Sequence, residues 1–338
     1  MTLPRKYLID YSKTRYYHCT SRCVRQDYLL DYSSIDEPQS QYRHKWILER
    51  LMLLSEAFCI DVYAFSIMDN HTHLVLGANT ELAKSLSNKS VLQRWSKIGS
   101  IPNYCHAYLS YSDEGKESVG DLANEKIAIY KSRLADISWF MKYFNEYIAR
   151  RANKEEEVKG HFWEARFSSQ ALLDSKALLN CMAYVDLNPV KAGKASSLEG
   201  SNFTSIQKRV GEFKRYRKDV KNIIPLNSIS KPEKYTNLPF SMSLQTYISY
   251  VGSAKTMLEK KAFVFDEVAN SKERLRPVFY FETMYGHFAG NKDLIEKTKK
   301  EVAKKMLKNN AIESDAKTVS PDLSLGIQYL IGKKRLSK

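Results

Sequence analysis

Two hydrophobic periodicities divide the first two-thirds of this 338-residue chain. Runs rich in aromatic and β-branched residues predict strands over 15–22, 61–68 and 71–76, and a strand or extended segment over 160–172. Apolar residues three or four positions apart predict helices over 41–58, 82–98, 130–152 and 177–187. Strands and helices in this order predict an α+β fold, in which helices cover one face of an antiparallel, ferredoxin-like sheet.

The same pattern predicts two regions. Residues 1–213 hold all of these elements and form one domain, with a Ser-, Gly- and Pro-punctuated loop or insertion at about 99–125. Residues 214–338 form a basic, mainly helical C-terminal region, with a linker-like stretch at 222–239. Within that region, helices are expected over 244–260 and 292–308.

Charge narrows the class of partner. The chain carries 53 Lys and Arg against 38 Asp and Glu, a net charge of +15, which favours a polyanion such as nucleic acid or an anionic membrane. No stretch approaches the length of a membrane span, and no apolar leader follows Met1. We therefore expect a nucleic-acid partner, no membrane and a cytoplasmic setting.

The cysteines do not indicate a disulfide framework. Their number is five and their spacing is irregular, so free thiols are expected. His18, Cys19 and Cys23 stand close enough in sequence to suggest a metal cluster. Adjacent residues of a strand face opposite sides, however, which separates His18 from Cys19.

Candidate chemistry begins at the strand that follows Asn70. His71 and His73 are two residues apart, so a strand presents both imidazoles on one face. Two imidazoles on a rigid strand provide half of a divalent-metal site. The spacing alone fits ordinary histidines at a strand start equally well.

A second candidate lies near the end of the helix expected over 177–187. Tyr184 and Asn188 are four residues apart and would share one helical face, just before Pro189 ends the helix. This pair combines a nucleophilic phenol with an amide oxygen ligand. It also fits a core tyrosine followed by a capping asparagine.

Four ordered segments resemble one protein family. They are the 62–76 hairpin ending in HTHLVL, and the segments YHCTSRCVR from Tyr17, GHFWEARFSS from Gly160 and AYVDLNPVKAG from Ala183. Together they resemble the HUH single-tyrosine transposases, in particular the REP-associated tyrosine transposase branch. Thr72 stands where the family has a hydrophobic residue between the two histidines. The resemblance covers about residues 15–206 and is weaker over 238–253.

The resemblance implies a site and an activity. His71 and His73 would bind Mg²⁺ or Mn²⁺, and Tyr184 would be the nucleophile. Asn188 would be the third metal ligand, with Asp186 and His161 as alternatives, although Asp186 should face away from Tyr184 on the helix. The implied activity is metal-dependent cleavage and rejoining of single-stranded DNA at hairpin-forming, REP-like sequences. It proceeds through a 5′-phosphotyrosine intermediate and serves transposition, a form of DNA recombination.

Basic and aromatic residues are the DNA-binding candidates. Aromatic rings near the site could stack unpaired bases, and arginines could hold phosphates or a guanine edge. The candidates are Arg22, Arg25, Arg150, Arg151, Trp163, Arg166 and Phe167, with Phe162 as a further stacking residue. Trp163 fits a core position equally well. Every catalytic candidate precedes Lys191, so residues 214–338 are expected to assist DNA binding.

Two alternative hypotheses of function are considered beside the transposase. One is a nickase of the relaxase or replication-initiator type, although Tyr184 has no second tyrosine three or four residues on. The other is a catalytically inactive protein that binds hairpin DNA. The oligomeric state is left open between monomer and homodimer. The resemblance places the chain in the bacterial cytoplasm, associated with the nucleoid.

Overall fold

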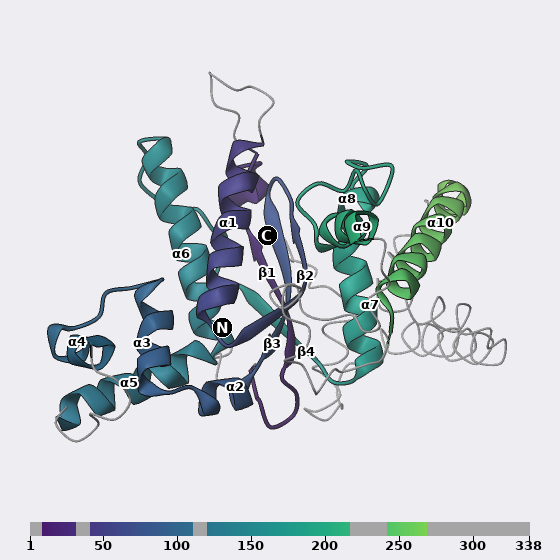
Figure 1. The fold of residues 1–338 in the computed structure, drawn as a ribbon. Coiled ribbons are helices and arrows are strands. Elements are labelled where there is room, and N and C mark those ends of the chain that lie inside the picture. Colours follow the sequence, from purple (N-terminus) through teal and green to yellow (C-terminus); the bar gives the residue numbers. More distant parts are fainter. Residues whose placement is uncertain (1–8, 32–40, 111–119, 217–241, 269–338) are drawn as a thin grey trace, which may run out of the picture. The chain divides into compact units, whose positions relative to one another are not determined.

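The central element is an antiparallel sheet of four strands in the order β2-β3-β1-β4 (Figure 1). The computed structural model describes residues 9–31, 41–110, 120–216 and 242–268. The strands are β1 Tyr16–Arg22, β2 Ile60–Ile67, β3 His71–Ala78 and β4 Ser168–Leu172. β1 pairs with both β3 and β4, which gives the βαββαβ arrangement of ferredoxin-like folds. The predicted α+β class and antiparallel sheet are confirmed.

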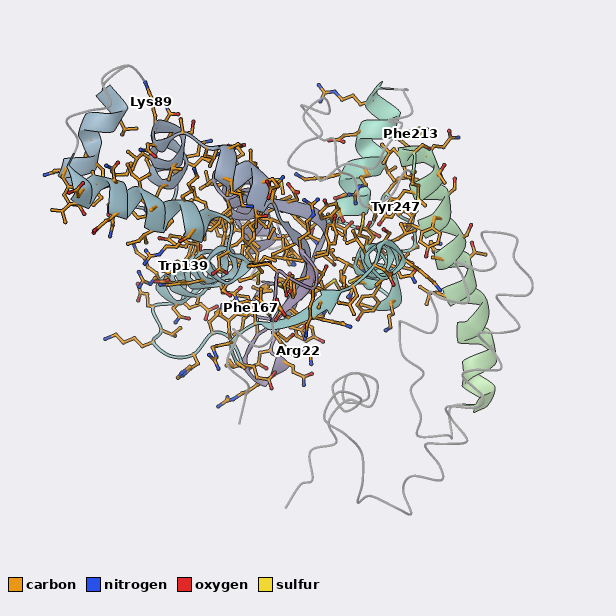
Figure 2. The ribbon with its side chains drawn as sticks, turned by 90° about the horizontal axis from the view of Figure 1, so that it is seen from below. Arg22, Lys89, Trp139, Phe167, Phe213 and Tyr247 are labelled. Atoms are coloured by element: carbon orange, nitrogen blue, oxygen red, sulfur yellow. The ribbon has the colours of Figure 1, made fainter. Side chains whose placement is uncertain are left out.

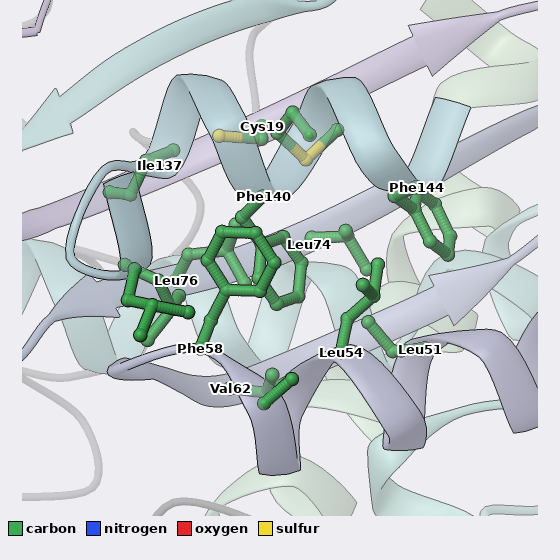
Figure 3. Close-up of a cluster of buried hydrophobic side chains, with 14 of the residues drawn as sticks. Cys19, Leu51, Leu54, Phe58, Val62, Leu74, Leu76, Ile137, Phe140 and Phe144 are labelled. Atoms are coloured by element: carbon green, nitrogen blue, oxygen red, sulfur yellow. The ribbon is translucent and has the colours of Figure 1, made fainter. Parts of the chain in front are cut away.

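Two long helices cover one face of the sheet. They are α1 Tyr42–Ala57 and α6 Ile137–Glu155. Alternate strand residues such as Cys19, Leu74 and Leu76 point to them and pack with Phe140 and Phe144 of α6 (Figure 3). All five side chains are fully buried, so this face is the main hydrophobic core.

The opposite face is also covered, so the prediction of helices on one face only was wrong. α7 Ser175–Asp186 packs against β2 and β3 there. All eight residues of β2 are buried, as are seven of eight in β3, and a strand buried on both sides needs a layer on each. The chain continues into α8 Asn188–Lys191 and α9 Ser205–Tyr216.

A helical insertion joins β3 to α6. It consists of α2 Thr80–Ser85, α3 Asn88–Ser96, α4 Asn103–Ser110 and α5 Asp121–Leu134. The expected loop at 99–125 therefore contains a helix and the start of another. The helices predicted over 82–98 and 130–152 are each two helices, because capping side chains interrupt them. Ser87 accepts a hydrogen bond from the Ser90 amide, and Asp136 accepts one from the Ser138 amide.

Described helices lie on both sides of residue 213, where the C-terminal region is predicted to begin. Two units are found, Met1–Lys255 and Thr256–Lys338. α9 crosses position 213, and the buried first turns of α10 Leu244–Val268 belong to the first unit. Beyond Val268 nothing is described, so the predicted helix over 292–308 lies outside the described residues, as does the linker over 222–239.

Three smaller features complete the description of the fold. The polar segment after β1 holds a 3₁₀ turn, Val24–Gln26. All five cysteines are free. Among the helices of the described ranges, none is long and apolar enough to cross a membrane.

Candidate active site

Three histidines gather on the sheet face that α7 covers. His71 and His73 come from β3, and the β1–β3 register brings His18 beside them. His18 Nε2 lies 2.9 Å from His73 Nδ1, and the two rings stack at 5.0 Å between centroids. The His71 and His73 rings are perpendicular, with centroids 4.9 Å apart. The predicted juxtaposition of His71 and His73 is therefore present.

Hydrogen-bond partners engage the Nδ1 atoms of His71 and His73. His71 Nδ1 lies 2.6 Å from the Asn70 side-chain oxygen, an acceptor, so Nδ1 carries the proton and Nε2 keeps its lone pair. His73 Nδ1 is engaged by His18 and by Thr20 Oγ1 at 3.2 Å, which leaves Nε2 as its other donor atom. Metal-ligating histidines are commonly oriented in this way by a partner at the second nitrogen.

Burial keeps all three imidazoles neutral. It lowers the pKa of His18 to about 4. Burial, with Arg22 nearby, lowers the pKa of His71 to about 4. Burial and the neighbouring His18 hold the pKa of His73 well below its usual value. Neutral imidazole is the form that binds metal, so the cluster is ready to do so at neutral pH.

Tyr184 reaches the same cluster from α7. Its ring centroid lies 5.7 Å from that of His73 and 6.1 Å from that of His18. Lys191 Nζ lies 5.4 Å from the Tyr184 ring centroid. Burial raises the pKa of the half-buried Tyr184, with Arg22 acting in the opposite direction, so the phenol is protonated at neutral pH. Arg22, at the end of β1, is labelled in Figure 2.

The chain around Tyr184 follows strong local signals. Asp174 caps α7 by accepting a hydrogen bond from the Ala177 amide at 2.6 Å. α7 ends at Asp186, and Pro189 lies in the first turn of α8. Asn188 therefore begins a new helix. The sequence had indicated instead that Asn188 shares one helical face with Tyr184. The side chain of the buried Asn188 nevertheless hydrogen-bonds to His71.

The two alternative ligands lie elsewhere. Asp186 is fully buried, and its side chain contacts Ser205 of α9 and Tyr247 of α10, away from Tyr184 as expected. It accepts hydrogen bonds from Ser205, the Ile206 amide and Tyr247. His161 is exposed, in the segment that precedes β4. Of the three ligand candidates, only Asn188 contacts His71 or His73 through a contact described here.

The donor set limits what the site could bind. Within the described ranges, no group of three or more His, Cys, Asp and Glu side chains is arranged to hold a metal ion. A metal here would have two imidazoles and the Asn188 amide oxygen as protein ligands, with positions left for water or phosphate. Mn²⁺ accepts such a mixed nitrogen and oxygen set, and Mg²⁺ prefers the oxygens. The two imidazoles and the amide oxygen could therefore hold a divalent cation with positions left open for other ligands.

The predicted DNA-binding arginines separate into two groups. Arg22 and Arg25 are exposed at the end of β1 and just after it, and Arg22 lies opposite His71 in the β1–β3 register. Arg150 and Arg151 lie on α6, which covers the other face of the sheet. Arg150 pairs with Glu146 at 2.6 Å, and Arg151 hydrogen-bonds to Glu155, Tyr147 and Tyr42. The structure therefore does not bring the α6 arginines to the site.

The segment from His161 to Phe167 runs beside the end of β1. The Glu164 amide donates to the Arg22 carbonyl at 2.8 Å, and Arg166 is exposed. Trp163 is half-buried, and its indole N–H donates to the Asn145 carbonyl at 2.9 Å. Phe162 and Phe167 belong to the hydrophobic core, so the expectation that they stack on bases is not supported.

Three residues at the site were missed. His18, Thr20 and Lys191 contact the histidines or Tyr184. His18 had been considered only in a cluster with Cys19 and Cys23, and the other two had not been considered. For His18 and Thr20, the alternation of residues along β1 could have indicated their place. Tyr16, His18, Thr20 and Arg22 alternate with Tyr17, Cys19 and Ser21, so the first four share one face of β1.

Comparison with known proteins adds one structural likeness. No family model matches this chain, and no curated protein does. The chain is similar to a REP-associated tyrosine transposase solved with a bound REP hairpin, at 16% identity and a TM-score of 0.35. The match covers 62% of this chain and 86% of that chain. A TM-score this low does not define a common fold, so function is argued below from the residues of this chain.

Proposed function

We propose that this protein is a metal-dependent, single-stranded DNA strand transferase that uses Tyr184 as its nucleophile. One observation carries the proposal. A tyrosine from α7 stands within 6.1 Å, ring to ring, of two hydrogen-bonded histidines, one of which belongs to the predicted metal pair. The other member of that pair, His71, contacts the Asn188 side chain.

The chemistry follows from the phenol. Tyr184 Oη would attack a backbone phosphorus, forming a 5′-phosphotyrosine and breaking the bond to the 3′ oxygen of the neighbouring nucleotide. The phenolic proton would leave to water, and the 3′ oxygen would take one up. Phenolate, with a pKa of about 10, leaves more readily than a sugar alkoxide. A 3′-hydroxyl can therefore reverse the step and rejoin a strand without another energy source.

The surrounding residues would prepare that attack. His71 and His73 would present Nε2 lone pairs, and Asn188 an amide oxygen, to Mg²⁺ or Mn²⁺. When bound, such an ion supplies polarisation of a non-bridging phosphate oxygen. Lys191 lies at the ring of Tyr184, and Arg22 is exposed beside His71 in the sheet register. Both cations would favour the approach of a phosphate and of the phenolate as it forms.

The choice of DNA as substrate rests on charge and on motif resemblance. The net charge of +15 favours a polyanion. Four ordered segments resemble the REP-associated branch of the HUH single-tyrosine transposases, which indicates hairpin-forming single strands. We therefore propose a folded hairpin with a short unpaired flank as the substrate, and transposition or repeat processing as the role.

The decisive experiment is a covalent-adduct assay with labelled hairpin DNA and Mn²⁺, read on a denaturing gel. The wild type should form an adduct that excess EDTA prevents. Tyr184→Phe should form none, yet should bind the hairpin within a few fold of the wild type, since the ring is kept. Tyr147→Phe is the matched control, because Tyr147 lies on α6 on the other face, and it should leave adduct formation intact.

Other outcomes separate the alternatives. An adduct formed by Tyr184→Phe would show that another tyrosine is the nucleophile. Hairpin binding without any wild-type adduct would favour the inactive DNA-binding protein. Equal attack on the hairpin and on its linear scramble would argue against hairpin recognition and leave a more general nickase of the relaxase or initiator type.

A further inference from the structure

A buried polar network lies directly behind the nucleophile. The Asp186 carboxylate is completely buried and accepts hydrogen bonds from Ser205 Oγ, the Ile206 amide and Tyr247 Oη. Arg209 of α9 is 1% exposed, and its guanidinium lies 3.7 Å from the Asp186 carboxylate. Asp186 thus ties the end of α7 to α9 and to α10.

The contact with α10 is built along one helical stripe. Leu244, Tyr247, Val251 and Ala254 recur three or four residues apart and are all buried. Tyr247 Oη donates to Asp186 at 2.5 Å, and the buried Tyr250 donates to the Asn180 side chain at 2.7 Å. Tyr247 is labelled in Figure 2. Two tyrosine hydroxyls of α10 therefore hold two polar side chains of α7.

Asp186 lies between the two proposed site residues of this segment, Tyr184 and Asn188. Asp186 follows Tyr184 by two residues, about 200° around a helix, so it holds the side of α7 that faces away from Tyr184. It also precedes Asn188 by two residues, at the break between α7 and α8. A small rotation of α7 about its axis would therefore move the Tyr184 hydroxyl and the Asn188 amide together.

General stabilisation does not account for such a network. Removing a carboxylate and a guanidinium from water costs several kcal/mol, and apolar residues of similar size often stabilise as well or better. What buried, directional contacts provide is one defined geometry. Catalysis needs that geometry, because a misplacement of about 1 Å can cost about a hundredfold in rate.

We propose that Tyr247, acting through Asp186, is a positioning residue that sets the rotation of α7 and thereby aligns Tyr184 with the histidines. This inference rests on the proposed strand-transfer function. It gives the start of α10 a role in the active site, in place of the purely DNA-binding role expected for residues after 213. Tyr250, through Asn180, supports the same alignment from a second point.

The test uses the full chain and three substitutions. Tyr247→Phe removes only the hydroxyl that contacts Asp186, and Tyr250→Phe removes the one that contacts Asn180. Tyr130→Phe is the matched control, since Tyr130 is 4% exposed but lies on α5 in the helical insertion, where its ring stacks on Trp95. Each variant is first checked for folding by circular dichroism.

Two quantities are then measured, the adduct-formation rate at saturating hairpin DNA and the Kd for the hairpin. We expect Tyr247→Phe to lower the rate by between about tenfold and a hundredfold, with Kd within a few fold of the wild type. Tyr250→Phe should lower the rate less, and Tyr130→Phe should change neither quantity. An unchanged rate in folded Tyr247→Phe overturns the inference. So does a rate that falls only as the folded fraction falls.

A second readout does not depend on activity. 3-Fluorotyrosine placed at position 184 reports the surroundings of that ring by ¹⁹F NMR. Its signal should shift in Tyr247→Phe and remain unchanged in Tyr130→Phe. If the wild type forms no adduct, the proposed function fails, but the fluorine signal still decides the positioning role. If Tyr247→Phe does not fold, Tyr250→Phe is measured in its place. In that case, an unchanged ¹⁹F signal together with an unchanged adduct-formation rate in Tyr250→Phe overturns the inference.

Discussion

The two faces of the sheet are made of alternate residues of the same strands, yet their side chains have different neighbours. Leu74 and Leu76 point to α1 and α6, where they belong to a cluster of buried apolar and aromatic side chains (Figure 3). His71 and His73 point to α7, where the neighbours are histidine, tyrosine, threonine and asparagine. Both faces are buried, so burial alone does not reveal which one is functional.

The two faces differ in what their burial does to the stability of the protein. The α1/α6 face gains its stability from removing apolar area from water, at roughly 25 cal/mol per Å². The α7 face encloses imidazoles whose charged forms are disfavoured there. Polar groups buried at a cost, and oriented by hydrogen bonds, are typical of a site whose arrangement serves chemistry.

The largest expected contrast is between two adjacent residues. His73→Ala should abolish adduct formation and weaken Mn²⁺ binding, measured by titration calorimetry, at any temperature where the protein is folded. Leu74→Ala should lower the free energy of unfolding by about 2–5 kcal/mol while the folded protein keeps its activity. Loss of activity in fully folded Leu74→Ala would show that the two faces do not act independently.

A smaller effect should appear with pH. The folded pKa of His18 is about 4, against about 6.5 for an unfolded chain, so between these values only the unfolded state takes up the proton. Stability is therefore complete above about pH 6.5 and is lost as pH falls towards 4, by about 1.4 kcal/mol per pH unit for each such histidine.

Urea unfolding at a series of pH values in metal-free buffer measures this slope. His18→Asn should reduce it, because the variant lacks the imidazole that the unfolded state protonates. Equal slopes in the wild type and His18→Asn would show that His18 is accessible to protons in the folded state.

The smallest effect concerns the residue between the two histidines. Thr72 is fully buried on the α1/α6 side, and its hydroxyl has no hydrogen-bond partner within the described residues. Thr72→Val keeps the shape and removes that hydroxyl, so we expect about 1 kcal/mol of added stability, read as a higher urea midpoint. The adduct rate should not change, because Thr72 faces away from the metal pair. A lower midpoint would mean that the hydroxyl is satisfied.

Local pattern predicted β1, β2 and β3 well, because each is a run rich in aromatic and β-branched residues. Asp174 marks the start of α7. Local pattern failed where side chains compete with the backbone, as at Ser87 and Asp136, which divide helices that the apolar pattern runs together. It also failed to foresee the second helical layer, since burial of a strand on both faces depends on segments that arrive much later in the chain.

The site was predicted where one short segment contains the chemistry, as with His71 and His73. Residues joined only by strand pairing were missed, because β1–β3 register cannot be obtained from either strand alone. His18 and His73 are separated by 55 positions. Asp186 and Tyr247 are separated by 61 positions, and their contact depends on where α10 packs.

These separations bear on how the protein is made. A chain leaves the ribosome from its N-terminus, and contacts distant in sequence form slowly. β1 is synthesised before the other strands but lies between β3 and β4 in the sheet. It can therefore complete its strand pairing only after β3 and then β4, at residues 168–172, have been made. Asp186 gains its last partner only when Tyr247 emerges. The histidine–tyrosine site would thus gain this last support only after Tyr247 has been made, so that a shorter nascent chain, although it already contains the histidines and Tyr184, would lack the contact that holds the end of α7.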